Sequence, residues 1–169
     1  MIFLSHNCKD KPVVRQIAQT LESVYGQENV FYDEWSIQPG DSIIENMNQG
    51  LEKCRYFFFF VSENSLASNM VKLEWQAALM KINRGIKFIP IRLDKSTMPA
   101  ILAQTLYIDL FTYGLETSVR QIIDVINGQN TFRPRNDFSN LIAEITQNEN
   151  VTVEIRAEYY LEPHSRYLI

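Results

Sequence analysis

The stretch Tyr56-Phe57-Phe58-Phe59-Phe60-Val61 is the longest apolar run in the chain. Successive side chains of a strand point to opposite faces of a sheet, so a strand formed by this run is apolar on both faces. Such a strand has to be covered on both sides, which places it near the middle of a parallel sheet. An exposed run of this composition would promote aggregation, and the regular patterning of the flanking segments argues against it.

The segments on either side of this run alternate short apolar stretches with segments of helical period. The expected strands are residues 2–4, 29–32, 55–61, 87–93 and 106–110. The expected helices lie between Asp10 and Gly26 and over residues 42–53, 68–83 and 115–127. This alternation is typical of βα units. We expect an α/β fold with a flavodoxin-like open parallel sheet of five strands in the order 2-1-3-4-5, with helices on both faces.

Apolar residues at helical spacing predict which side of each helix faces the sheet. The first helix is expected to bury Val13, Ile17, Leu21 and Val24, the second Ile43, Ile44, Met47 and Leu51, and the third Val71, Trp75, Ala78 and Ile82. Asp10 is expected to cap the first helix and Gly26 to end it. Residues 34–42 contain Pro39 and Gly40 and are expected to form a loop.

The composition is that of an ordinary soluble globular protein. Of 169 residues, 46% are hydrophobic and 21% are charged, which excludes a disordered, collagen-like or coiled-coil chain. The 16 basic and 20 acidic residues give a formal charge of −4, so no nucleic acid is expected as a partner. No run approaches the about 18 apolar residues that span a bilayer, and no membrane association is expected. Cys8 and Cys54 are too few for a disulfide framework or a metal site, which favours a cytoplasmic protein with reduced thiols.

The character of the sequence changes after Gly128. Residues 129–137 are expected to form a linker, residues 138–145 one short helix and residues 151–157 a strand, with a further apolar run at 167–169. A segment of about 40 residues does not bury a useful core alone. We therefore expect residues 1–128 to form one domain, and residues 129–169 to form the linker and the start of a second, truncated β-rich domain. A hairpin packed on the first domain is an equal alternative.

In open parallel sheets, ligands bind at the carboxyl ends of the strands, near the switch point between strands 1 and 3. Three motifs occupy these places: Phe3-Leu4-Ser5-His6-Asn7 with Asp10 behind it, Phe31-Tyr32-Asp33 leading to Pro39-Gly40-Asp41-Ser42, and Val61-Ser62-Glu63-Asn64-Ser65 followed by residues 68–74. In this order and spacing they resemble the Toll/interleukin-1 receptor (TIR) domain over about residues 1–128, and within that family its bacterial branch. The resemblance implies that Pro39, Gly40, Asp41 and Ser42 belong to the BB loop, a loop used in assembly.

Glu74 is the candidate catalytic residue. It lies in the first turns of the expected third helix, about 60° around the helix axis from Val71 and so at the rim of the apolar face. A carboxylate there can point into the cleft at the strand ends. A solvated glutamate favoured by the helix dipole is the alternative. The resemblance favours catalysis, because in enzymatic TIR domains the glutamate at this position cleaves NAD+.

The resemblance thus implies NAD+ as the substrate, with no separate cofactor and no metal. Nicotinamide leaves as a neutral base, so no general acid is needed, and positive charge develops on the ribose. A fixed carboxylate beside that charge stabilises the transition state more than the ground state. Water as the nucleophile gives ADP-ribose, whereas the adenine ring or a ribose hydroxyl of the same molecule gives a cyclic product.

An aromatic side chain is expected to stack on the nicotinamide. The family commonly has a tryptophan four residues before the glutamate, where this sequence has Met70, and Trp75 is assigned to the core. The stacking residue is then expected to be Phe3, Tyr32 or Trp35, and Trp35 is favoured because it lies in a polar loop.

Polar residues at the strand ends complete the expected site. By the same resemblance, Ser5 and His6 line the ribose and pyrophosphate region, and a backbone hydrogen bond is the alternative role of His6. Asp33 either binds a hydroxyl group or caps a turn. Ser62 and Ser65 either donate to a phosphate or cap the helix that follows them.

The resemblance implies an NAD+-cleaving hydrolase or cyclase that is activated by TIR–TIR self-association in bacterial, anti-phage immunity. A fused or separate sensor domain is the expected further partner. The alternative is a non-enzymatic scaffold that binds other TIR domains through the BB loop. Glu74 favours the enzyme, and Met70 leaves room for the scaffold. A response-regulator receiver is disfavoured, because Ser5 and His6 stand where a receiver has an acidic pair.

Overall fold

The phenylalanine run forms β3 (Tyr56–Val61), the central strand of a parallel sheet in the order β2-β1-β3-β4-β5. β1 (Ile2–Ser5) pairs with β3 and with the edge strand β2 (Val30–Phe31). On the other side, β4 (Lys87–Arg92) pairs with β3 and with β5 (Ile108–Asp109). The predicted strand order is confirmed in this computed structural model, which describes residues 1–81, 85–132, 141–147 and 151–157.

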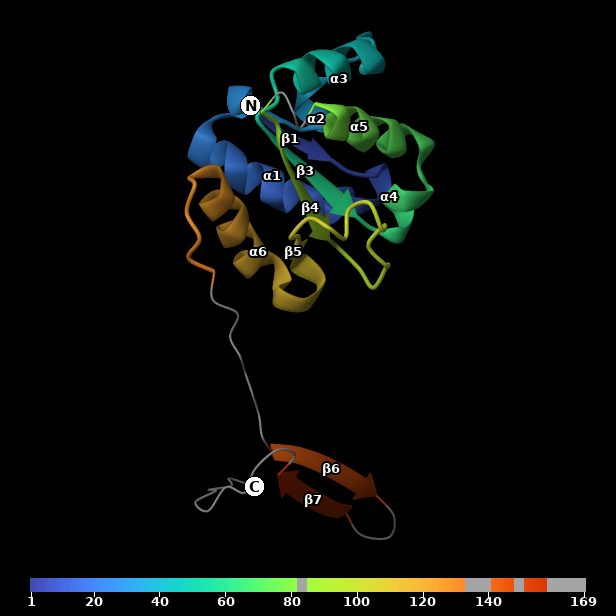
Figure 1. The fold of residues 1–169 in the computed structure, drawn as a ribbon, viewed down its shortest axis with the longest axis vertical. Coiled ribbons are helices and arrows are strands. Elements are labelled where there is room, and N and C mark those ends of the chain that lie inside the picture. Colours follow the sequence, from blue (N-terminus) through green and yellow to red (C-terminus); the bar gives the residue numbers. More distant parts are fainter. Residues whose placement is uncertain (82–84, 133–140, 148–150, 158–169) are drawn as a thin grey trace. The chain divides into compact units, whose positions relative to one another are not determined.

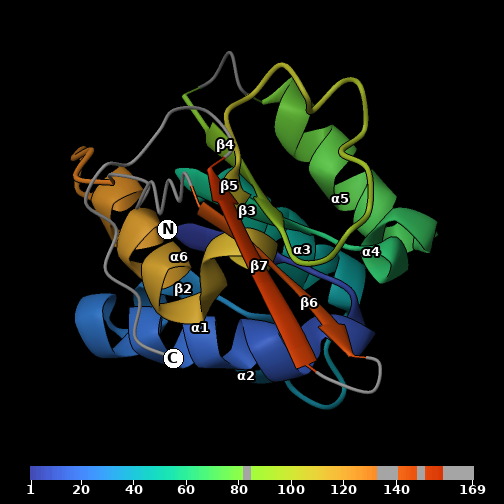
Figure 2. The same ribbon diagram turned by 90° about the horizontal axis from the view of Figure 1, so that it is seen from below.

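Helices cover both faces of the sheet, as Figures 1 and 2 show. One face packs against α1 (Lys11–Tyr25) and α6 (Leu110–Ile126), and the other against α3 (Ile43–Glu52) and α5 (Asn69–Met80). Short helices complete the Met1–Thr131 unit: η1 (Cys8–Asp10), η2 (Gln27–Asn29), α2 (Asp33–Ser36) and α4 (Glu63–Ala67).

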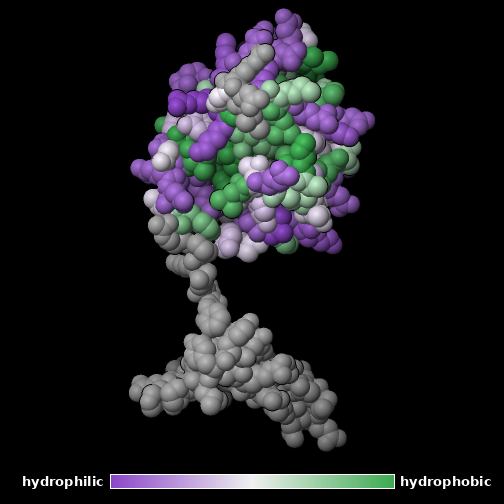
Figure 3. Space-filling view, viewed as in Figure 1, coloured by the Kyte–Doolittle hydropathy of each residue, from purple (hydrophilic) through white to green (hydrophobic). Residues whose placement is uncertain are grey.

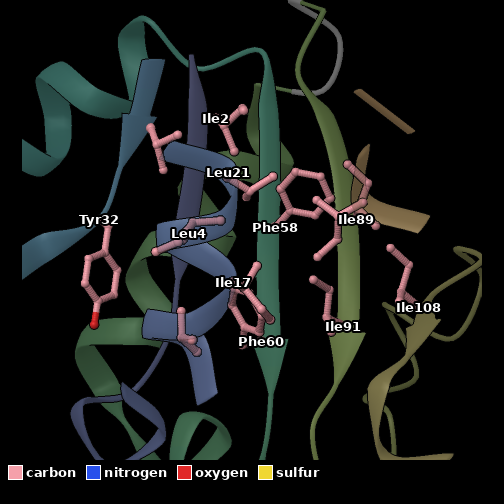
Figure 4. Close-up of a cluster of buried hydrophobic side chains, with 14 residues drawn as sticks. Ile2, Leu4, Ile17, Leu21, Tyr32, Phe58, Phe60, Ile89, Ile91 and Ile108 are labelled. Atoms are coloured by element: carbon pink, nitrogen blue, oxygen red, sulfur yellow. The ribbon is translucent and has the colours of Figure 1, made fainter. Parts of the chain in front are cut away.

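The four phenylalanines of β3 divide between two cores. Phe58 and Phe60 pack with Leu4 and with Ile17 of α1 in the cluster drawn in Figure 4. Phe57 and Phe59 belong to the opposite cluster, which includes Trp75 of α5. All four are 0% exposed, so the two-sided burial expected from their sequence is confirmed.

The buried stripe of α1 is rotated from the predicted one. Ile17 and Leu21 are buried as expected, but Val13 and Val24 are 36% and 52% exposed. Val14 and Ala18 are buried in their place, which gives the compact i, i+3, i+4, i+7 spacing of a helix face.

α3 also meets the sheet differently from the prediction. Ile43 and Ile44 are 52% and 64% exposed rather than inward, whereas Leu51 is buried. Gly50 lies so close to the sheet that a Cβ atom there would be 2.8 Å from Cδ2 of Phe31. The C-terminal half of α3 therefore contacts the sheet, and its first turn projects into solvent.

Other helix boundaries also differ from the predicted ones. The loop expected at 34–42 begins as the short helix α2. The helix expected over 68–83 is α5, capped by Ser68 as its sequence suggests, and the short helix α4 before it was not predicted. α6 begins at Leu110 and is interrupted at Gly114, whose φ of 76° suits glycine, so the segment predicted to start at 115 follows this interruption. Ile82 lies outside the described residues.

The second unit, Phe132–Ile169, contains an antiparallel pair of strands, β6 (Leu141–Gln147) and β7 (Val151–Ala157). β7 was predicted, but the helix expected over 138–145 is wrong, because residues 141–145 belong to β6. The apolar run at 167–169 lies outside the described residues. That residues 129–169 begin a second domain stays a prediction.

Candidate active site

A cavity of about 400 Å³ lies at the carboxyl end of β1, where topology predicted a ligand site. The expected residues that line it are Phe3, His6, Asp33, Met70 and Glu74. They come from β1 and the turn after it, from α2 and from the first turns of α5. The sheet thus brings together side chains that are up to 71 positions apart, from Phe3 to Glu74.

Glu74 is half-buried and is held by a single short hydrogen bond. Ser5 Oγ donates to Glu74 Oε2 at 2.6 Å, and Ser5 itself is buried beneath the carboxylate at the end of β1. Burial raises the pKa of Glu74 to about 7; the Ser5 bond opposes this rise, and the charge of Asp33 adds to it. Glu74 is therefore a carboxylate that changes its charge near neutral pH.

His6 and Asp33 form a second polar pair in the cavity. The His6 ring stacks on Tyr32 with centroids 5.2 Å apart, and its Nδ1 lies 3.0 Å from the carbonyl oxygen of Leu4. His6 Nε2 lies 3.5 Å from Asp33 Oδ1. The backbone contact proposed as the alternative for His6 is thus present, and His6 is also one of the residues that line the cavity.

Ion pairs hold α2, and with it Asp33, against α1. Lys11 Nζ lies 3.0 Å from Asp33 Oδ2, and Arg15 forms two hydrogen bonds with Glu34. These groups are exposed or partly exposed, so the pairs add little to the stability of the fold. Their effect is to orient Asp33 rather than to stabilise the fold.

Asp10 ties the loop after β1 to the loop after β3. Its side chain was expected to cap α1, but it makes no cap bond there and instead accepts from Ser62 Oγ at 2.6 Å and from Asn64 Nδ2 at 2.9 Å. Asn7 donates to the backbone carbonyl of Asn64 at 3.2 Å. Hydrogen bonds between the two loops therefore fix the wall from which His6 projects.

Ser65 and Tyr32 are not among the residues that line the cavity. Ser62 and Ser65 form a reciprocal capping box at the start of α4, so the capping alternative is the one that the structure shows. The Tyr32 ring is buried between His6 and Trp35.

Trp35 lies away from the cavity as well. It is in α2, packs edge-on against Tyr32, and its Nε1 donates to the carbonyl oxygen of Val30 at 3.1 Å. It lines a separate cavity of about 500 Å³ beside β2 and α3, which Glu74 does not reach. The expected stacking role of Trp35 is therefore not supported, because its indole covers the edge strand.

Trp35→Phe tests this reassignment. We expect a loss of at least about 1 kcal/mol in the free energy of unfolding, since the hydrogen bond to the edge strand is lost and only a smaller aromatic ring remains. Any NAD+ cleavage should keep its KM. Denaturant unfolding measures the stability, and steady-state kinetics measure KM. A raised KM at unchanged stability would show that Trp35 contacts the substrate after all.

Several residues that line the cavity were not predicted as site residues. They are Leu4, Asn7, Cys8, Phe31, Ile37, Ile43, Met47, Ser68 and Val71. Val71 and Met70 stand three and four positions before Glu74, so helical spacing places them on its side of α5. No pattern in the sequence predicts that Ile37, Ile43 and Met47 line the cavity, because their positions depend on how α2 and α3 pack against the sheet.

The expected BB-loop residues connect α2 to α3 on the surface. All of Pro39, Gly40, Asp41 and Ser42 are exposed. The Asp41 carboxylate accepts from the backbone N–H of Gln38 at 3.0 Å, Gly40 has a φ of 98°, and Ser42 caps α3 through Glu45 N. The loop thus has a defined turn, followed directly by the exposed Ile43 and Ile44.

No group of three or more metal-binding side chains occurs within the described part of the chain. Over the same residues, no helix combines the length and apolar character that crossing a membrane requires.

A family model described as a TIR domain matches residues 2–123. The chain belongs to the TIR domain family. The match covers the whole sheet, the cavity and Glu74, and it confirms the resemblance drawn from the three motifs.

Two curated bacterial proteins are similar to this TIR domain. One, 26% identical over 132 residues, is the "2' cyclic ADP-D-ribose synthase AbTIR" of Acinetobacter baumannii. The other, 29% identical over 127 residues, is the "2' cyclic ADP-D-ribose synthase BtTIR" of Bacteroides thetaiotaomicron. The alignments cover 74% and 73% of this chain, but only 48% and 42% of those proteins, so the chain spans less than half their length.

A solved structure shares the fold. It is the TIR domain of the Toll-related receptor TRR-2 from Hydra magnipapillata, with a TM-score of 0.63 and 18% identity. The similarity covers 75% of this chain and 97% of that one.

Proposed function

We propose that this TIR domain cleaves NAD+ at the bond between nicotinamide and ribose, with Glu74 as the catalytic residue. The observation that carries the proposal is the Glu74 carboxylate itself, which lies in a cavity at the carboxyl end of the sheet and is fixed by Ser5. The two bacterial relatives support it, because both are named as synthases of a cyclic ADP-ribose.

The reaction requires little more than a carboxylate held beside the ribose. When the bond between C1′ of the ribose and the ring nitrogen breaks, its electron pair goes to the nitrogen and nicotinamide leaves neutral. Positive charge is left on the ribose, as in glycoside cleavage. Glu74 stabilises that charge most at the transition state, and partial burial strengthens the interaction by excluding water.

The nucleophile then decides the product. Attack by water gives ADP-ribose, and attack by a ribose hydroxyl of the same molecule gives a cyclic ADP-ribose; either nucleophile loses one proton. Glu74 accepts that proton readily because its pKa is raised to about 7. The names of the relatives favour the cyclic product.

We also propose that the domain is activated by self-association, in bacterial immunity against phage. The support is surface chemistry: Ile43 and Ile44 project beside the BB loop, and apolar side chains gather in the middle of the face drawn in Figure 3. Exposed apolar patches often mark interaction sites. A TIR scaffold without catalysis would use the same surface, so the assay below has to separate the two functions.

The experiment is to incubate the chain with NAD+ over a range of protein concentrations and to follow nicotinamide release. We expect release, with a specific activity that increases with protein concentration. Chromatography of the products against ADP-ribose and cyclic standards identifies the nucleophile. If concentrated protein releases no nicotinamide, the enzyme proposal fails and the scaffold remains.

The rate should increase with pH. The pKa of Glu74 lies above that of a free glutamate, so its ionised, active form accumulates as the pH rises through about 7. Between pH 6 and pH 8 the ionised fraction increases about tenfold, and we expect the rate to follow it.

Ser5→Ala should move the midpoint of this pH profile upward, because the lost hydrogen bond is the one that favours the ionised carboxylate. Ser23→Ala, which removes an exposed hydroxyl bonded to Thr20 in α1, is the control and should leave the midpoint unchanged. A downward movement in Ser5→Ala would contradict the assigned role of Ser5.

A further inference from the structure

The antiparallel strands β6 and β7 (Figure 1) divide their residues unevenly between the two faces of the hairpin. Successive residues of a strand alternate between faces, so every second pair of the register lies on the same face. One face carries the pairs Leu141–Ala157, Ala143–Ile155, Ile145–Val153 and Gln147–Val151. We call it the apolar hairpin face, because it holds no charged residue and Gln147 alone is polar.

The opposite face of the hairpin is polar. It carries the pairs Ile142–Arg156, Glu144–Glu154 and Thr146–Thr152. Like charges directly opposite each other in a sheet repel, and glutamates are almost never fully buried unless they are paired with a cation. The face with Glu144 and Glu154 therefore suits water, and the apolar hairpin face is the one that needs a cover.

The composition of the second unit limits what can supply that cover. A two-stranded hairpin alone is at best marginally stable in water, and no third strand joins β6 and β7 within the described residues. Folded units of about 40 residues or fewer usually depend on disulfides, a metal or oligomerisation. Residues 132–169 contain no cysteine and one histidine, His164, which disfavours the first two means. Oligomerisation is the means that remains.

The apolar hairpin face is complementary to itself. A two-fold axis parallel to the strands, between two stacked hairpins, places β6 of one copy over β7 of the other. Leu141 then lies over Ala157 of the second copy, and Ala143 lies over Ile155 of the second copy. A large residue thus meets a small one at both levels, as interdigitating sheets about 10 Å apart require. Without charges, the face meets its own copy with no repulsion.

We propose that the apolar hairpin face packs against the same face of a second copy of this chain and thereby joins two TIR domains. The inference rests on the proposed function and names a surface outside the TIR domain that promotes its self-association. Pairing of the hairpins raises the effective concentration of the attached TIR domains. Four residue pairs are far fewer than the about 20–30 residues a side of a stable interface, so the dimer dissociates in the micromolar range.

Sedimentation velocity of the full chain across the micromolar range tests the dimer. Val153→Lys puts a charge on the apolar hairpin face and should raise the dissociation constant at least tenfold. Thr152→Lys, one residue away on the polar face, is the matched control and should keep the wild-type value. A wild-type chain that stays monomeric would show that the face is covered within one molecule, and equal dissociation constants for the two variants would exclude this face. Either result overturns the proposal.

Disulfide cross-linking tests the stacking without relying on a disruptive charge. Chains with Ala143→Cys and chains with Ile155→Cys are mixed in a Cys8→Ser background, because Cys8 is an exposed thiol, and are oxidised with oxidised glutathione. We expect the mixed disulfide to form at least tenfold faster than between Glu144→Cys and Glu154→Cys chains, which carry the pair on the polar face. Equal rates for the two mixtures would contradict the stacking of the apolar faces.

Nicotinamide release separates this inference from the proposed function. In Val153→Lys, the protein concentration that gives half-maximal specific activity should rise at least tenfold, with the same plateau, whereas Thr152→Lys should match the wild type. If the wild type releases no nicotinamide, the proposed function fails, and sedimentation still decides whether the hairpins pair. If Val153→Lys loses the dimer but keeps the wild-type concentration dependence, the hairpin does not promote activation and the inference fails, while the NAD+-cleaving function stands.

Discussion

Glu74→Gln is expected to reduce nicotinamide release from NAD+ by about 10³-fold or more, because the charge that stabilises the ribose cation is lost. The shape of the side chain is kept, and its amide oxygen can still accept the hydrogen bond from Ser5. The loss should therefore fall on kcat more than on KM. Single-turnover and steady-state measurements at pH 8 test this.

The same substitution should stabilise the fold at pH 8. A carboxyl group whose pKa rises to about 7 on folding is ionised in the folded state only at a free-energy cost, and that cost is greatest above pH 7. Because Glu74 is half-buried, we expect a gain on the order of 2 kcal/mol at pH 8 that disappears below about pH 4.5.

Glu63→Gln, on the exposed first turn of α4, is the matched control and should change neither activity nor stability. Full activity in Glu74→Gln would show that Glu74 does not take part in the reaction. Loss of activity together with loss of structure would show instead that Glu74 is needed for folding.

Phe58→Ala and Phe59→Ala should each lower the free energy of unfolding by about 3–5 kcal/mol. Both side chains are 0% exposed, but they lie in different cores, Phe58 on the side of α1 and α6, and Phe59 on the side of α3 and α5. Each substitution leaves a cavity that the neighbouring strands cannot fill. Since a domain of this size is stable by about 5–15 kcal/mol, either change removes much of the total.

Denaturant unfolding monitored by circular dichroism measures both variants. Phe111→Ala is the matched control, because Phe111 is 55% exposed at the start of α6 and should cost at most about 1 kcal/mol. Similar losses for Phe58 and Phe59 are the signature of a strand covered on both faces. A small loss at either position would mean that one face of β3 is not packed in solution.

Sequence reasoning succeeded where a single local pattern carries the information. The apolar run of β3, the βα alternation and the motifs at the strand ends led to the sheet order, the cavity edge and Glu74. It failed for Val13 and Val24, since a helix with apolar residues over a wide arc leaves its rotation to packing. It did not find the place of Trp35, because a polar neighbourhood in the sequence does not reveal a hydrogen bond to an edge strand.

The C-terminal strands show the same limit. The alternation of Val151–Ala157 predicted β7, but the helix expected at 138–145 was wrong because a short apolar segment fits a helix as well as a strand. Pairing with β7 decides in favour of β6. A partner strand is a long-range contact that no local pattern contains.

By itself, the sequence determined that the chain forms a doubly covered parallel sheet, because a strand-length run that is apolar on both faces stands among alternating βα units. It also determined that a carboxylate stands at the carboxyl edge of that sheet. Only the tertiary structure decided that Ser5 holds this carboxylate, that burial raises its pKa, and that His6 lies 3.5 Å from Asp33. These contacts join residues from separate strands and helices, and only packing of the complete domain sets their distances.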